Sequence, residues 1–217
     1  PEIERLRKET PIPFERWLEL YGHVPLPPYI DRADDSNDRH VYQTVYAENT
    51  GSAAAPTAGF HFTDDLLAKL RAKGVQITTV TLHVGIGTFR PMRAENIEDH
   101  SMHEEFFEIS PEFVETFKKA KAAGKRIVAV GTTTVRTLEN WDQKTAGIFS
   151  TRAFIKPGYE FKVVDDLITN FHLPKSTLIV LVAAAMGLEN EKAAYRHAID
   201  GSYRFFSYGD AMLIRGN

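Results

Sequence analysis

Residues 110–139 read SPEFVETFKKAKAAGKRIVAVGTTTVRTLE, and this stretch decides the fold class. Its first part has the spacing of apolar residues that an amphipathic helix needs over residues 110–123, and Gly124 ends that helix. The apolar run at residues 127–130 (IVAV) is typical of a buried strand. Gly131 then leads through three threonines into a second helix. A helix, a strand and a helix in this order predict an α/β domain.

The same order of helix, glycine and strand occurs earlier in the chain. Thr63 is placed to cap a helix that runs to Lys73, Gly74 follows it, and residues 75–84 (VQITTVTLHV) have the composition of a strand. We therefore expect a mixed, largely parallel sheet with flanking helices. Further helices are predicted over residues 13–21 and 189–200, a buried helix or strand over 177–186, and strands over 41–46, 106–109, 154–155, 161–164 and 167–168.

The composition is that of an ordinary globular protein, with 217 residues, of which 43% are hydrophobic and 25% charged. The absence of cysteine excludes a disulfide scaffold, a zinc–thiolate site, an iron–sulfur cluster and a catalytic thiol. Residues 1–124 hold 14 basic and 20 acidic side chains, and residues 125–217 hold 12 and 9, so a polyanion would need a local basic patch. The longest apolar run, residues 178–187, is about half of what spans a bilayer.

The chain opens on Pro1 rather than methionine, within a charged stretch, which leads us to expect a fragment or a processed chain. Nothing in these first residues predicts a signal peptide.

A run of small residues, GSAAAPTAG at 51–59, suggests a loop where the backbone approaches another group closely. His61 lies between this loop and the predicted helix cap at Thr63, where a helix N-terminus favours anions. Position alone is equally consistent with a functional histidine and with an ordinary loop histidine.

A second candidate is TLHVGIGTFRP at 81–91, where glycines follow a predicted strand. Such glycines let backbone N–H groups meet a ligand, but the third glycine of a dinucleotide motif is missing. We interpret residues 85–88 as a ligand loop. His83 is either part of it or a histidine of the core.

The segment DHSMHEE at 99–105 brings two histidines and a carboxylate within reach of one point. A metal site must be considered for His100, His103 and Glu105, although the spacing is not that of a known helical zinc motif. An acid–base or hydrogen-bonding cluster fits better, and a solvated charged turn remains open.

Three further stretches carry polar groups beside aromatic or glycine residues. In GTTTVRTLE at 131–139, hydroxyls at a helix start and Arg136 one turn later suit an anionic or polar ligand group. In LITNFHLPKSTL at 167–178, Phe171 between Asn170 and His172 suits a planar base, or forms a packed turn. The aromatic segment YRFFSYGDAMLI at 203–214, which contains Arg204, suits either single-stranded RNA or a hydrophobic core.

Taken together, the motifs resemble one family, the S-adenosylmethionine:tRNA ribosyltransferase-isomerases of queuosine biosynthesis. The resemblance runs from about Gly22 to the C-terminus. The motifs that carry it are LPPYI at 26–30, YQTVYA at 42–47, GSAAAPTAGFHFT at 51–63, TLHVGIGTFRP at 81–91, HSMHEE at 100–105, GTTTVRTLE at 131–139, PGYEF at 157–161, LITNFHLPKSTL at 167–178 and YRFFSYGDAMLI at 203–214.

The resemblance implies transfer and isomerisation of the ribosyl group of S-adenosylmethionine onto 7-aminomethyl-7-deazaguanine at the wobble position of tRNA. The product would be epoxyqueuosine-tRNA, with release of adenine and methionine. It also implies a cytoplasmic, monomeric enzyme with no metal and no separate cofactor. Family members have a longer N-terminal part with an inserted β-barrel, so residues 1–21 would be the tail of that barrel and 22–217 the main α/β domain. The stretch from Asn140 to Arg152 is also shorter than in the family.

The chemistry that the resemblance implies needs a base beside the sulfonium, a donor for the departing adenine and a neutral attacking amine, and histidine suits such transfers. The candidate catalytic residues are His61, His100, His103 and Glu105. The candidate substrate-binding residues are His83, Gly85, Gly87, Thr88, Gly131, Thr132, Thr133, Arg136, Asn170, Phe171, His172 and Arg204. The alternatives are an inactive RNA-binding module, a metal-dependent hydrolase built on His100, His103 and Glu105, and a methyltransferase.

Overall fold

The computed structural model describes residues 13–85 and 96–216. Contacts divide the chain into two compact units, Pro1–Val41 and Tyr42–Asn217. This division falls later in the chain than the expected boundary after residue 21. The assignment of residues 1–21 to a β-barrel stays a prediction.

The first unit contains helices α2 (Phe14–Tyr21) and α3 (Asp38–Val41). The predicted helix over residues 13–21 is confirmed, with Pro13 as its N-cap. The guanidinium of Arg32 donates two hydrogen bonds to the buried carboxylate of Asp38, at 2.6 and 2.7 Å. This pairing, with a backbone N–H from Asp35, lowers the pKa of Asp38 to about 2.

One sheet of the second unit joins β1 (Thr81–His83), β2 (Glu105–Ile109) and β4 (Gly147–Thr151) in the order β1-β2-β4. Both pairings are antiparallel. Strand β2, which confirms the prediction for 106–109, buries Glu105, Phe107 and Ile109 on one face and exposes Phe106 and Glu108 on the other.

The other sheet joins β3 (Val128–Val130), β5 (Asp166–Asn170) and β6 (Ala211–Arg215) in the order β3-β5-β6. Strands β3 and β5 are parallel, and β5 and β6 are antiparallel. The expectation of a largely parallel sheet is therefore wrong for the described residues. The reason is that the helix between β2 and β3 connects two different sheets, so the alternation of helix and strand builds a parallel crossover only between β3 and β5.

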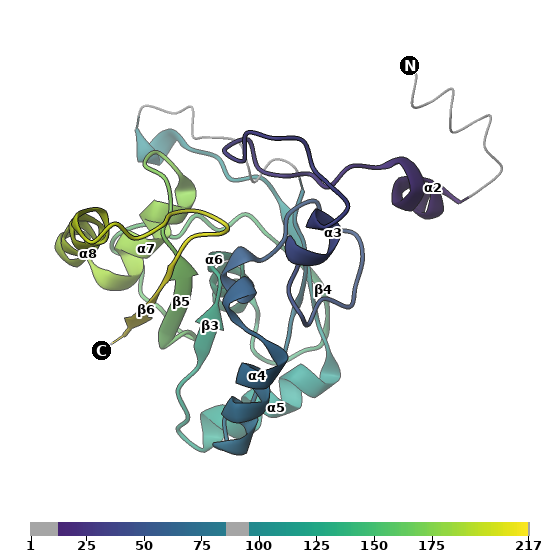
Figure 1. The fold of residues 1–217 in the computed structure, drawn as a ribbon. Helices are drawn as coiled ribbons and strands as arrows, with labels where there is room; N and C mark the ends of the chain where they lie inside the picture. Colours follow the sequence, from purple (N-terminus) through teal and green to yellow (C-terminus); the bar gives the residue numbers. More distant parts are fainter. Residues whose placement is uncertain (1–12, 86–95, 217) are drawn as a thin grey trace. The chain divides into compact units, whose positions relative to one another are not determined.

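The main helices of this unit are α4 (Asp64–Ala72), α5 (Pro111–Ala122), α6 (Thr132–Asn140), α7 (Thr177–Met186) and α8 (Leu188–Asp200), with 3₁₀ turns η1 (Thr57–His61) and η3 (Ile97–Asp99). The predicted cap is confirmed, since the Thr63 hydroxyl accepts the N–H of Leu66 at 3.2 Å. Helix α6 contacts strands of both sheets and lies between them in Figure 1, while α7 and α8 pack on each other. The core therefore surrounds α6, whose Val135 and Leu138 are buried.

Several predicted strands do not form, and in two of them side chains accept backbone N–H groups. Residues 41–46 form no strand: Val41 ends α3, and the N–H of Thr44 binds the side chain of Gln43. Residues 161–164 form none because the buried carboxylate of Glu139 accepts the N–H groups of residues 162, 163 and 164. Residues 75–80 and 154–155 are also irregular, and β4 and β6 were not predicted.

Candidate functional site

The carboxyl ends of β3 and β5 lie side by side because these strands are parallel neighbours, and ligands of α/β sheets bind at such ends. Gly131 follows β3 with a φ of 91°, a conformation that favours glycine, and its N–H donates to the carbonyl of Ile168 at 2.9 Å. A side chain on Gly131 would contact Ala58, 3.9 Å away. The small-residue loop therefore meets the start of α6, where Thr132 is buried and Thr133 partly buried.

At the end of β5, the structure brings His61 and Asn170 together. The amide nitrogen of Asn170 lies 3.0 Å from Nε2 of His61 and 3.5 Å from the carbonyl oxygen of Asp210. The amide oxygen of Asn170 accepts from the Thr57 hydroxyl at 3.3 Å. Asn170 is 2% exposed whereas the histidine is exposed, so one partner is fixed in the core and the other faces solvent.

Asp210 adds a carboxylate to this cluster. It accepts the backbone N–H of Arg204 at 2.7 Å and a guanidinium N–H of the same residue at 3.2 Å. These hydrogen bonds, with a smaller contribution from the nearby His61, lower the pKa of Asp210. Arg204 itself is exposed, so the expected substrate-binding arginine holds Asp210 at the edge of the cluster.

A strained turn places Asp210. Phe206 adopts a φ of 71°, which is uncommon for a bulky side chain, and its N–H donates to the carbonyl of Phe171. A side chain on Gly209 would lie 2.4 Å from the carbonyl oxygen of Arg204, so only glycine fits there. Backbone strain of this kind is characteristic of functional sites.

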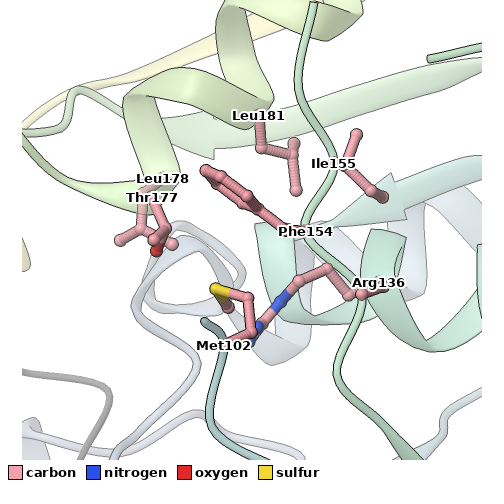
Figure 2. A pocket seen from close by; sticks show the side chains of 8 residues that line it. Met102, Arg136, Phe154, Ile155, Thr177, Leu178 and Leu181 are labelled. Atoms are coloured by element: carbon pink, nitrogen blue, oxygen red, sulfur yellow. The ribbon is translucent and has the colours of Figure 1, made fainter. Parts of the chain in front are cut away.

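Arg136 and Glu105 form a buried ion pair, at 5% and 6% exposure, away from solvent. Nε of Arg136 is buried and has no hydrogen-bond partner among the described residues. The arginine lines a pocket with Met102, Phe154, Thr177 and Leu181, and Figure 2 shows its side chain reaching toward Met102. The space inside, about 10 Å³, admits one water-sized group.

The sequence analysis did not predict that Glu105 pairs with Arg136. We expected an acid–base or orienting role for Glu105 and a substrate carboxylate as the partner of Arg136. In the structure the two side chains pair with each other. What the pair still offers to a ligand is the N–H of Arg136 at Nε.

The other two histidines of the acid–base hypothesis lie apart from this pair. His100 packs edge-on against the pocket residue Phe154, with ring centroids 5.3 Å apart. His103 is exposed. Within residues 13–85 and 96–216, no group of three histidine, aspartate or glutamate side chains is arranged to hold a metal ion.

The expected ligand loop after β1 is only partly described. His83 pairs with Phe106 across the sheet, and its Nδ1 lies 3.0 Å from where a side chain on Gly51 would begin. Gly85 is exposed. Gly87 and Thr88 lie outside the described residues.

The two residues after Asn170 have different surroundings. Phe171 is 5% exposed and packs against the rings of Tyr195, Tyr203 and Phe205, which gives it a role in the core. Nε2 of His172 lies 2.8 Å from the Thr169 hydroxyl, and burial lowers the pKa of His172 to about 4. His172 is therefore neutral at physiological pH.

Sequence reasoning missed Thr57 and Asp210 as members of the His61 cluster. Both are far from Asn170 in sequence, and only the fold joins them. The available signals were weak: Thr57 is a hydroxyl in a run of small residues, and Asp210 follows a glycine in the aromatic segment. In the described part of the chain, no helix has the length and apolar character to cross a membrane.

Comparison with known proteins agrees with the α/β fold and with the family resemblance of the sequence. The sequence profile of the queuosine biosynthesis protein family matches residues 2–214. The chain is 58% identical over 205 residues to the S-adenosylmethionine:tRNA ribosyltransferase-isomerase of Treponema denticola, covering 92% of this chain and 59% of that protein. It is also similar to the crystal structure of an S-adenosylmethionine tRNA ribosyltransferase from Thermotoga maritima, with 47% identity and a TM-score of 0.60 over 72% of this chain and 50% of the other. The chain spans between half and three fifths of the length of these relatives. It belongs to the queuosine biosynthesis protein family.

Proposed function

We propose that this chain carries the main catalytic domain of an S-adenosylmethionine:tRNA ribosyltransferase-isomerase. It would transfer and isomerise the ribosyl group of S-adenosylmethionine onto 7-aminomethyl-7-deazaguanine at the tRNA wobble position, giving epoxyqueuosine-tRNA, adenine and methionine. S-adenosylmethionine is a consumed substrate in this proposal, with no metal and no separate cofactor. The enzyme would act as a cytoplasmic monomer.

The observation that carries the proposal is the contact between His61 and Asn170 at the shared end of β3 and β5. An exposed imidazole on a buried amide, beside a glycine loop at a helix start, combines a proton-transfer group with a place for a polar ligand. The names of the Treponema and Thermotoga relatives support the choice of S-adenosylmethionine and tRNA as substrates.

The chemical steps need few groups. A proton leaves the carbon beside the sulfonium, and the bond from the ribose to adenine breaks with its electron pair passing to the base. The deazaguanine amine then forms a bond to a carbon of the ribosyl group and loses a proton. The carbon–sulfur bond breaks with its electron pair passing to methionine as an oxygen of the ribosyl group closes the epoxide. We assign acid–base and orienting roles to His61, His100 and His103, and we give Glu105 the task of holding Arg136. The loops at 85–88 and 131–133 would hold S-adenosylmethionine, with Arg136 offering Nε to a polar atom of it. The bound base would lie beside His83, Asn170, His172 and Arg204.

The test follows free adenine. Because the chain spans 59% of its Treponema relative, the chain is joined to the part of that relative that it does not cover, and the chimaera is incubated with S-adenosylmethionine and tRNA bearing 7-aminomethyl-7-deazaguanine. We expect adenine release and a modified nucleoside with the mass of epoxyqueuosine. The Treponema protein is the positive control. If it releases adenine and the chimaera does not, the proposal is wrong.

A substitution then locates the chemistry. His61→Gln in the chimaera is expected to lower adenine release about 100-fold, the scale of a lost proton-transfer group. His61 is exposed, so the free energy of unfolding should change by less than about 0.5 kcal/mol. His197→Gln on α8, also an exposed histidine, is the matched control and should leave turnover unchanged. If the two substitutions lower adenine release equally, His61 is not part of the site.

A further inference from the structure

Asn170 is a buried amide whose hydrogen-bonding groups all face polar partners. It is the last residue of β5, pairs with Ala211 of β6, and is 2% exposed. A buried amide costs free energy unless its donors and acceptor are matched. Here Thr57 donates to the oxygen, while the nitrogen faces the Asp210 carbonyl and the His61 ring.

These partners fix which way the amide points. The carbonyl oxygen of Asp210 can only accept, so the NH₂ group of Asn170 must face it. The same NH₂ group lies 3.0 Å from Nε2 of His61, which must therefore accept as well. A neutral imidazole that accepts at Nε2 carries its proton on Nδ1.

The geometry points to Asn170 as a positioning residue: its amide holds His61 in the Nδ1–H tautomer, so that Nδ1–H donates to a ring nitrogen of a bound purine. This inference deepens the proposed function and rests on it for the identity of the ligand. In that reaction the purine is the departing adenine, which receives the electron pair of the broken bond to ribose. A hydrogen bond from Nδ1–H would stabilise the negative charge that develops there.

The charges around His61 act on the same ring. The carboxylate of Asp210 interacts electrostatically with His61, and it also accepts a hydrogen bond from Arg204. A protonated His61 would place an N–H against the amide N–H of Asn170, which opposes the attraction of Asp210. Titratable groups on the surrounding segments include Tyr46, Asp64, Asp65, Lys69, Arg71, His172 and Tyr208.

The tautomer can be measured without any substrate. The 217-residue chain is labelled with ¹⁵N at histidine, and long-range ¹H–¹⁵N spectra at neutral pH distinguish a protonated Nδ1 from a protonated Nε2. His61→Gln identifies the His61 signals. We expect the Nδ1–H tautomer for His61 in the unsubstituted chain, and the Nε2–H tautomer would overturn the inference.

A substitution tests whether Asn170 is the cause. In Asn170→Asp the carboxylate can only accept, so His61 should change to Nε2–H and its titration midpoint should rise. The matched control is Asn190→Asp. Asn190 is exposed on α8, and its amide donates to the carbonyl of Met186. If folded Asn170→Asp keeps the original tautomer, Asn170 does not set it. If that variant fails to fold, the tautomer of the unsubstituted chain still decides.

Turnover gives the second readout. In the chimaera, Asn170→Asp should lower kcat for adenine release on the order of 100-fold. KM for S-adenosylmethionine should change little, and kcat of the variant should fall as the pH rises, because only the protonated ring of His61 then carries Nδ1–H. A structural role alone would lower the amount of active enzyme without moving the pH profile. Absence of adenine from the unsubstituted chimaera would contradict the proposed function and leave the tautomer result standing.

Discussion

Two polar clusters in the second unit each contain an arginine paired with a carboxylate, and they differ in their access to solvent. At the end of β5, an exposed His61 contacts a buried amide, and a carboxylate is shared with an exposed arginine. Beside β2, Arg136 and Glu105 are both buried and pair with each other. The open cluster keeps a titratable group available to a ligand, whereas in the closed pair each charge neutralises the other and only the Nε of Arg136 is without a partner among the described residues. A histidine that is open to solvent can transfer a proton, whereas a buried ion pair contributes to holding the fold.

The largest expected effect comes from breaking the closed pair. Arg136→Met leaves Glu105 as a buried carboxylate without a partner, which should lower the free energy of unfolding by about 3–5 kcal/mol. Urea unfolding of the 217-residue chain measures this. Lys192→Met removes an exposed pair with Glu189 and should cost at most about 1 kcal/mol. Equal losses in the two variants would contradict the comparison.

The second effect distinguishes His172, two residues after β5, from the exposed His197 of α8. Burial lowers the pKa of His172 from 6.5 to about 4, so the folded state binds fewer protons than the unfolded state. The resulting stability is present above about pH 6.5 and is lost as the pH falls toward 4, by about 2 kcal/mol between pH 7 and pH 5. The measurement is the difference in unfolding free energy between the unsubstituted chain and His172→Gln across this range. If the exposed His197→Gln changes the pH dependence as much, burial of His172 is not the cause.

The sequence was most informative where local rules decide the structure. The predicted cap at Thr63 and the helices α4 and α5 obey rules that act within a few residues. His61 and Asn170 were both singled out, but their contact joins residues 109 positions apart, which no local pattern reveals.

The failures have a common physical cause. Residues 161–164 have the composition of a strand, yet the carboxylate of Glu139 accepts hydrogen bonds from the N–H groups of Val163 and Val164. The pairing of Glu105 was also not predicted, because its partner Arg136 lies 31 residues away on α6. In both cases the partners of a buried carboxylate lie far from it in sequence, and sequence alone does not show which carboxylates are buried.

The smallest effect tests how His61 is held. Thr63 is exposed and caps α4, two residues after His61. Thr63→Ala removes the acceptor of the Leu66 N–H and should lower the free energy of unfolding by about 1 kcal/mol. Urea unfolding measures the cost, and Thr63→Ser, which keeps a hydroxyl, should recover most of it. The His61 tautomer should not change in either variant, because Asn170 holds the ring from the core and the cap holds only the helix that follows. A changed tautomer in Thr63→Ala would mean that the open cluster depends on the end of α4 as well as on β5.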